Sequence, residues 1–137
     1  QHMIRVLLCC GGGFSSSYVA ERMKKEIIAK NLSNQLEMEF SPFSLVLEKI
    51  DNFDIIICCP HLNIYVKQLL EKTDVQVPIY ILPPRMYGNM EIEEIYQDVI
   101  DLLEIYQQTH MNPVHFPGEE NVLKITRQKA YKHVYQK

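Results

Sequence analysis

The sequence has no tryptophan and only five glycines, and its uninterrupted apolar runs are no longer than residues 55–59. A membrane-spanning helix needs about 20 predominantly apolar residues, so we expect no direct membrane insertion. Hydrophobic residues make up 47% of the chain and charged residues 23%, values that exclude a wholly disordered or fibrous protein. A chain of 137 residues can bury a core without disulfide or metal cross-links.

Charge is divided unevenly along the chain. Residues 1–108 carry 9 basic and 15 acidic side chains, whereas residues 109–137 carry 5 basic and 2 acidic ones. The acidity of the longer part indicates that nucleic acid is not a partner, because phosphate contacts require clustered Lys and Arg. The basic end has two open interpretations: contact with an acidic surface, or a solvated helix face.

The four cysteines occur as two adjacent pairs, Cys9-Cys10 and Cys58-Cys59. Sequence neighbours rarely form a disulfide, because the strained ring fits poorly with a trans peptide. The N-terminal part shows no secretory leader pattern, and Gln1-His2 before Met3 resemble a cloning remnant. We therefore expect reduced thiols and a cytoplasmic protein.

Short apolar runs alternate with amphipathic stretches along residues 3–108. Leu36, Met38 and Phe40 alternate with glutamates, which predicts a strand near a sheet edge, whereas the very apolar run 53–59 predicts a central strand. This order predicts an α/β fold, an open four-stranded parallel sheet flanked by helices on both faces. The predicted strands are 4–9, 36–40, 53–59 and 77–82, and the predicted helices are 16–30, 41–50, 62–72 and 91–108.

Residues 109–137 are predicted to be a C-terminal extension of that 3–108 domain. Pro113 and Pro117 indicate a linker, and residues 119–135 have the composition for one more helix. His110, His115 and His133 lie in this extension without a metal-ligand spacing, and we expect them to be solvated.

Three of the five glycines, Gly11, Gly12 and Gly13, follow the first predicted strand directly. In an open parallel sheet, ligands bind beyond the carboxyl ends of the strands. Glycines let successive backbone N–H groups point at one anion, and the start of the next helix adds further unpaired N–H groups. Hydroxyl groups follow at residues 15–17. These features predict a phosphate loop, with a purely packing role as the alternative.

A cysteine beside this loop indicates covalent chemistry, because N–H groups and a helix dipole that hold phosphate also stabilise a thiolate. Side chains alternate along a strand, so Cys9 and Cys10 cannot both face the loop. Cys9 completes the apolar run and is predicted to lie in the core. Cys10 begins the loop and is predicted to be the nucleophile.

Other loops of this kind fit less well. A Walker-type loop needs a lysine at its end, and the first lysine is Lys24. A dinucleotide fingerprint needs a third glycine where Ser16 stands. A cysteine phosphatase closes its loop with an arginine that holds the phosphate, and Ser16 stands there as well. The loop therefore suits a phosphoryl group that is passed on.

The segment Cys10-Gly11-Gly12-Gly13-Phe14-Ser15-Ser16-Ser17 resembles the active-site loop of the IIB components of the bacterial phosphotransferase system, lactose/cellobiose (chitobiose) class. Cys10 falls on the phosphorylated cysteine of that family, Gly13 on its glycine, and residues 15–17 on its serine/threonine-rich triplet.

Two later segments agree with this family over about residues 3–105. Pro60 matches the proline of the family's Gly-Pro-Gln, whereas Cys59 and His61 depart from it, and Tyr87-Gly88 match its Tyr-Gly. The family's tyrosine near the first of these segments would fall at Ile64, so its role is not transferred.

The resemblance implies a phosphocarrier, a protein-phosphocysteine–sugar phosphotransferase that needs no metal or other cofactor. Such a protein accepts phosphate from a phosphohistidine of its IIA partner onto Cys10 and passes it to a sugar held by the membrane IIC permease. The backbone of Gly11, Gly12, Gly13, Phe14, Ser15, Ser16 and Ser17 would hold the phosphoryl oxygens, with Pro60, His61 and Tyr87 as accessory residues.

Two alternatives stay open. Cys10, Cys59 and His61, at the ends of strands that could be adjacent, suit a metal- or redox-responsive thiol binding module. A relay domain that has become regulatory could instead use the extension to dock a partner.

Overall fold

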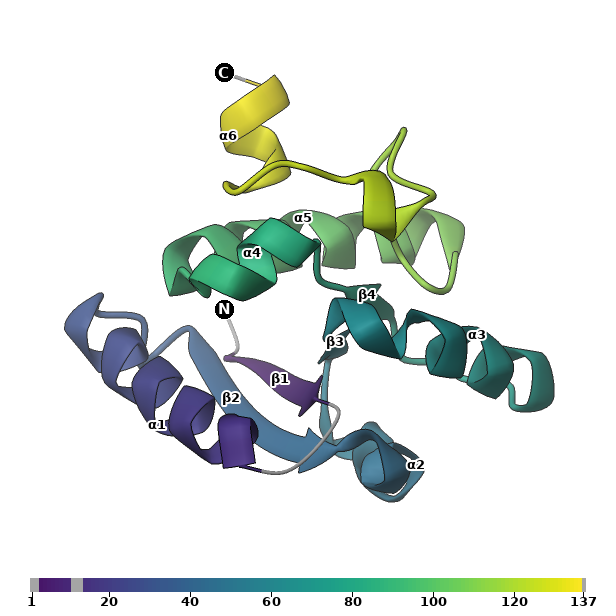
Figure 1. The fold of residues 1–137 in the computed structure, drawn as a ribbon, viewed down its shortest axis with the longest axis horizontal. Helices are drawn as coiled ribbons and strands as arrows, with labels where there is room; N and C mark the ends of the chain where they lie inside the picture. Colours follow the sequence, from purple (N-terminus) through teal and green to yellow (C-terminus); the bar gives the residue numbers. More distant parts are fainter. Residues whose placement is uncertain (1–2, 11–13, 137) are drawn as a thin grey trace.

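The computed structural model describes residues 3–10 and 14–136, which form a four-stranded parallel sheet with helices around it (Figure 1). The strand order is β2-β1-β3-β4, and all three strand pairs are parallel. The predicted fold class is confirmed. The strands are β1 (Ile4–Cys10), β2 (Leu36–Pro42), β3 (Ile55–Cys58) and β4 (Ile79–Ile81).

Burial along the strands follows their place in the sheet. Every residue of β3 is buried, as expected for a central strand covered on both faces. In β2, Leu36 and Met38 are buried while Glu37 and Glu39 are exposed, and β2 is the edge strand that the alternation predicts.

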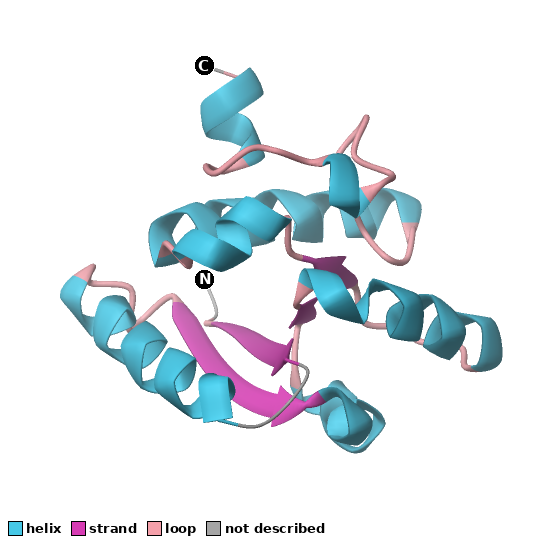
Figure 2. Ribbon diagram, in the orientation of Figure 1, coloured by secondary structure: helices cyan, strands magenta, loops and turns pink. Residues whose placement is uncertain are grey.

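Helices cover both faces of the sheet (Figure 2). Core side chains from α1, α4 and α5 pack on one face, and side chains from α2 and α3 pack on the other. The longer helices are α1 (Phe14–Ala29), α3 (Asn63–Lys72) and α5 (Ile92–Thr109), and the shorter ones are α2 (Val46–Lys49), α4 (Pro84–Asn89) and α6 (Tyr131–Tyr135).

The predictions for the segments after β2 and after β4 differ from the structure. The helix expected over residues 41–50 is wrong at its start, because β2 continues to Pro42 and is followed by the 3-10 turn η1 (Phe43–Leu45), α2 and η2 (Ile50–Asn52). The prolines after β4 begin helix α4, which was not predicted, because a proline fits the first turn of a helix as well as it ends a strand.

The extension is not the single helix expected over residues 119–135, and that prediction is wrong. The segment contains only the short turn η4 (Val122–Lys124) and α6, with non-helical chain between them. Arg127 and Ala130 are buried in this non-helical part. In Figure 1 the chain of the extension runs beside α5 before α6.

The first part of the extension lies along the open side of β4. The Asn112 side chain accepts a hydrogen bond from the Ile79 N–H at 2.8 Å and donates to the Val77 carbonyl at 3.0 Å. The Val114 N–H donates to the Ile79 carbonyl at 2.9 Å. These contacts occupy backbone groups that an edge strand otherwise leaves unpaired.

Arg127 anchors the later part of the extension in a buried ion-pair network. Its guanidinium donates to Asp98 of α5 at 2.8 Å and to Glu119 at 2.7 and 3.0 Å. The Tyr80 hydroxyl donates to the same Asp98 carboxylate at 2.6 Å. Burial raises the pKa of Asp98, while the Arg127 charge and the hydrogen bonds from Tyr80, Tyr131 N–H and Arg127 oppose that rise.

Lys129 and two histidines of the extension also contact acceptors within the chain. Lys129 donates to Glu91 at 2.9 Å, and the His133 ring lies 2.7 Å from Glu94. His115 is half-buried, with Nδ1 2.9 Å from the Phe116 carbonyl. Two of the five basic residues of the extension, Arg127 and Lys129, are thus paired with this chain's own carboxylates. None of the helices in the described part of the chain has the length and apolarity to cross a bilayer.

Candidate functional site

The cysteines lie at the carboxyl ends of the two central strands. Cys9 and Cys10 end β1, and Cys58 ends β3 with Cys59 directly after it. Cys9 and Cys58 are register partners, and the Cys59 N–H donates to the Cys9 carbonyl at 3.2 Å, which continues the ladder by one residue. All four thiols thus meet at the sheet edge where parallel α/β proteins bind ligands.

Strand alternation sorts these thiols into two pairs on opposite faces of the sheet. Cys10 and Cys59 belong to the core cluster beneath α1, α4 and α5, whereas Cys9 and Cys58 belong to the cluster beneath α2 and α3. The prediction that Cys9 lies in the core, facing away from Cys10, is confirmed.

The expectation that Cys10 begins the loop is wrong. Cys10 is the last residue of β1, pairs in register with Pro42, and has only 4% of its surface exposed. The edge strand β2 also extends to residue 42, so its pairing with β1 continues as far as Cys10.

Cys10 is held as a protonated thiol by its described neighbours. A hydrogen bond with Cys59, burial, and the sulfurs of Cys59 and Cys9 raise the pKa of Cys10 well above its usual range, and a hydrogen bond with Tyr87 lowers it. The sequence predicts the opposite direction, from the N–H groups of the glycine loop. Gly11, Gly12 and Gly13 lie outside the described residues.

Among the described residues, Tyr87 of α4 is a polar side chain that reaches these sulfurs. Its half-buried side chain is hydrogen-bonded to Cys59 and Cys10, and burial with these two thiols raises the pKa of Tyr87 to about 12. The hydroxyl therefore keeps its proton at neutral pH and is available as a donor to a charged sulfur.

His61 and Pro60 occupy the turn that follows β3. Pro60 is buried at the first position of the 3-10 turn η3 (Pro60–Leu62). The exposed His61 ring lies edge-on to the Tyr87 ring, with centroids 6.1 Å apart. Two of the three predicted accessory residues, His61 and Tyr87, thus lie beside each other, and Tyr87 reaches Cys10.

The predicted phosphate loop leads into α1, which begins at Phe14, two residues earlier than expected. Residues 14–17 form its first turn, and the side chains of Phe14, Ser15, Ser16 and Ser17 lie outside the described part of the structure. The first turn of a helix has N–H groups without intrahelical partners and a partial positive charge, so this backbone can bind an anion.

The structure brings together only part of the suggested metal site. Cys10 and Cys59 are neighbours, but His61 packs on Tyr87. Within residues 3–10 and 14–136, no group of three or more His, Cys, Asp and Glu side chains is arranged to hold a metal ion.

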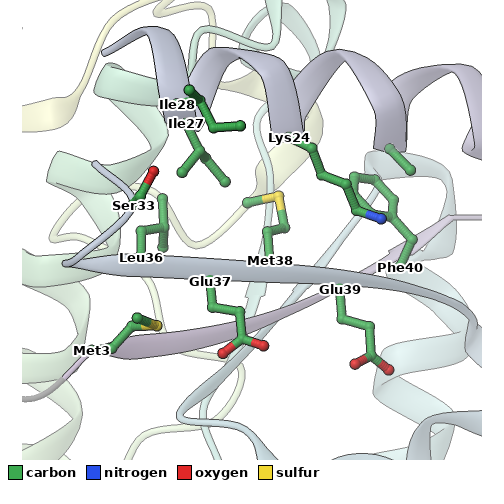
Figure 3. Close-up of a pocket in the computed structure, with 11 residues that line it drawn as sticks. Met3, Lys24, Ile27, Ile28, Ser33, Leu36, Glu37, Met38, Glu39 and Phe40 are labelled. Carbon is green, nitrogen blue, oxygen red and sulfur yellow. The ribbon is translucent and has the colours of Figure 1, made fainter. Parts of the chain in front are cut away.

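A cavity of about 620 Å³ lies away from the cysteines, between α1 and the edge strand β2 (Figure 3). Ile27 and Lys24 of α1 and Met38 of β2 line it, and none of the four cysteines does. The site proposed from the sequence is thus a strand-end surface and not this cavity.

The sequence and the fold both resemble those of known proteins. The sequence profile of the phosphotransferase system lactose/cellobiose-specific IIB subunit matches residues 5–98. The chain belongs to this IIB family. A sequence comparison with curated proteins gives no match.

Two solved IIB structures are similar to the chain. The cellobiose-specific IIB component from Borrelia burgdorferi is 27% identical, covers 75% of this chain and 94% of its own, and has a TM-score of 0.57. The lactose-specific IIB component domain from Streptococcus pneumoniae is 15% identical, covers 80% of this chain and 99% of its own, and has a TM-score of 0.46.

Membership of the IIB family places this domain in a sugar phosphotransferase system and supports a phosphocarrier role.

The family profile ends at residue 98, the position of the buried aspartate that Arg127 neutralises. Sequence reasoning missed this pair, because neither residue belongs to a motif and the two are 29 positions apart.

Proposed function

We propose that Cys10 carries the phosphoryl group of this IIB domain, taking it from a phosphohistidine of a IIA protein and giving it to a sugar bound by a membrane IIC permease. The observation that carries the proposal is the place of Cys10: the last residue of a central strand, shortly before the N-terminus of α1 and in contact with the Tyr87 hydroxyl. We propose a cytoplasmic location for this exchange.

The bonds and protons of the transfer balance when Cys10 starts as a protonated thiol. The Cys10 sulfur attacks phosphorus, the S–P bond forms as the N–P bond breaks, and the thiol proton passes to the departing imidazole nitrogen. In the second transfer a sugar hydroxyl attacks phosphorus, the S–P bond breaks, and the hydroxyl proton passes to the sulfur. The raised pKa of Cys10 favours the return of that proton.

The backbone and Tyr87 have complementary roles in this proposal. N–H groups of residues 11–17 stabilise the equatorial oxygens, which carry most of the charge in the transition state. The Tyr87 hydroxyl donates to the sulfur as it gains charge, and His61 borders the approach to the same sulfur.

Exposed apolar side chains near the strand ends suit the docking of protein partners. Tyr18 of α1, Leu47 of α2, and Ile64 and Tyr65 of α3 are exposed, on helices that follow β1, β2 and β3. Exposed apolar groups gathered at one end of a sheet are typical of interaction surfaces.

Transfer from a phosphorylated IIA protein tests the proposal. The intact protein and the Cys9→Ala variant are expected to acquire one phosphoryl group each, because Cys9 lies on the opposite face of the sheet. The Cys10→Ser variant is expected to acquire none. Equal labelling of Cys10→Ser and the intact protein would falsify the assignment of Cys10.

A further inference from the structure

Cys59 is a second thiol beside the proposed phosphoacceptor, at a position where this chain departs from the family's Gly-Pro-Gln. Its thiol donates to the Cys9 carbonyl at 3.3 Å, and its sulfur is hydrogen-bonded to Cys10. Cys59 is fully buried, and both sulfurs lie in the same core cluster. Apart from its hydrogen bond to Cys10, this thiol takes no part in the bond-making and bond-breaking steps proposed above.

The backbone geometry suits a bond between the two sulfurs. Residues 10 and 59 directly follow the register partners Cys9 and Cys58 on adjacent parallel strands. Paired strands lie about 4.8 Å apart, within the roughly 4.4–6.8 Å that separates the Cα atoms of disulfide-bonded cysteines. The two side chains also point to the same face of the sheet.

The other thiol pair has the same spacing but a different environment. Cys9 and Cys58 have no exposed surface and are packed among apolar side chains of α2 and α3. The Cys10–Cys59 pair touches the half-buried Tyr87, whose ring contacts the exposed His61. Among the described residues, Tyr87 thus connects the Cys10–Cys59 pair to an exposed side chain.

We propose that Cys10 and Cys59 form a reversible disulfide when the protein meets a peroxide, and that this bond switches off phosphoryl acceptance. The inference rests on the proposed function, which requires that a phosphohistidine can reach the Cys10 sulfur. A peroxide is smaller than a phosphohistidine and can therefore reach the same sulfur.

The chemistry proceeds in two balanced steps. The Cys10 sulfur attacks one oxygen of hydrogen peroxide, the S–O bond forms as the O–O bond breaks, and the thiol proton passes to the departing oxygen. The products are a sulfenic acid and water, so sulfur is oxidised and the peroxide is reduced. The Cys59 thiol then attacks the sulfenic sulfur, the S–S bond forms, and a second water leaves. A thiol reductant restores both thiols by exchange. Phosphorylated Cys10 has its sulfur in an S–P bond and does not enter this sequence.

Peptide mapping of the intact protein after hydrogen peroxide treatment tests the bond without a phosphodonor. Fragmentation of the linked peptides between residues 9 and 10 and between residues 58 and 59 is expected to place the bond at Cys10–Cys59, and dithiothreitol separates the peptides. A link between Cys9 and Cys58, or no link at all, overturns the inference. The same samples are then offered a phosphorylated IIA protein. Acceptance is expected to fall at least tenfold after peroxide and to return after reduction.

Two variants separate the switch from general damage. Without a resolving thiol, Cys59→Ala is expected to lose acceptance in peroxide and not regain it with dithiothreitol, because Cys10 oxidises further. The matched control Cys58→Ala, one residue earlier, keeps the reversible response. Full recovery of Cys59→Ala overturns the inference. If the reduced intact protein accepts no phosphate while the 10–59 link forms, the proposed function fails and the disulfide stands.

Discussion

At the residue scale, the protonation of Cys10 depends on two neighbours that act in opposite directions. Cys59 raises the pKa of the thiol through a hydrogen bond, and Tyr87 lowers it by donating to the sulfur. A phosphoacceptor of this kind is a thiol before transfer and a phosphorylated sulfur after it. The two side chains therefore govern how easily the sulfur gives up its proton.

The rate at which Cys10 is alkylated reports the opposing effects of Cys59 and Tyr87 on the pKa of this thiol. Tyr87→Phe is expected to raise the pKa of Cys10 and slow its modification by iodoacetamide at fixed pH, roughly tenfold for about 1.4 kcal/mol of lost hydrogen bonding. Cys59→Ala is expected to lower the pKa and speed the reaction. Tyr65→Phe removes an exposed hydroxyl on α3 and serves as the control. The same direction of change in both variants would contradict this assignment.

Strand alternation in the sequence predicted that Cys9 and Cys10 face opposite sides, and the structure agrees. The contact between Cys10 and Cys59 could only be suggested, because strand order depends on long-range pairing that no local pattern encodes. The raised pKa of Cys10 follows from that contact and from burial, so it could not be read from the loop sequence.

At the scale of elements, α4 positions Tyr87 and was the least predictable helix. It has six residues and includes Gly88, and both features weaken a helical pattern in the sequence. The strands and the long helix α5 were predictable because apolar runs and an apolar stripe mark them directly. The helix expected over residues 119–135 does not form, because this segment instead buries Arg127 through tertiary contacts that the local sequence does not encode.

Gly88→Ala is expected to stabilise the protein by about 0.5–1 kcal/mol, because alanine favours a helix and costs less backbone entropy. A Cβ at Gly88 has no heavy atom within 4 Å. Gly118 has equally open space but a φ of +83°, so Gly118→Ala is expected to destabilise by about 1 kcal/mol or more. Urea denaturation measures both variants. Shifts of the same sign would show that backbone conformation is not the cause.

At the scale of the whole molecule, the extension is part of the folded body and completes its core. Val114 and Phe116 join the cluster that also contains Cys10, and Arg127 neutralises the buried Asp98. Arg127 also donates to the Met86 sulfur at 3.1 Å, one residue before Tyr87. The extension thus contacts the helix that carries a side chain of the proposed site.

Arg127→Met is expected to destabilise the protein by about 3–5 kcal/mol, because it leaves the buried Asp98 carboxylate without its cation. Lys129→Met removes a nearby exposed cation that pairs with Glu91, and its effect on unfolding is expected to be far smaller. Urea denaturation of both variants measures the difference. Equal effects would mean that the buried pair contributes no more than a surface contact.

The most direct test of the account is to identify the residue that carries phosphate in the unaltered protein. After incubation with a phosphorylated IIA protein, peptide mapping is expected to find one phosphoryl group, on the Cys10 sulfur. Phosphate on His61, or on another cysteine, would contradict the proposed relay through the end of β1.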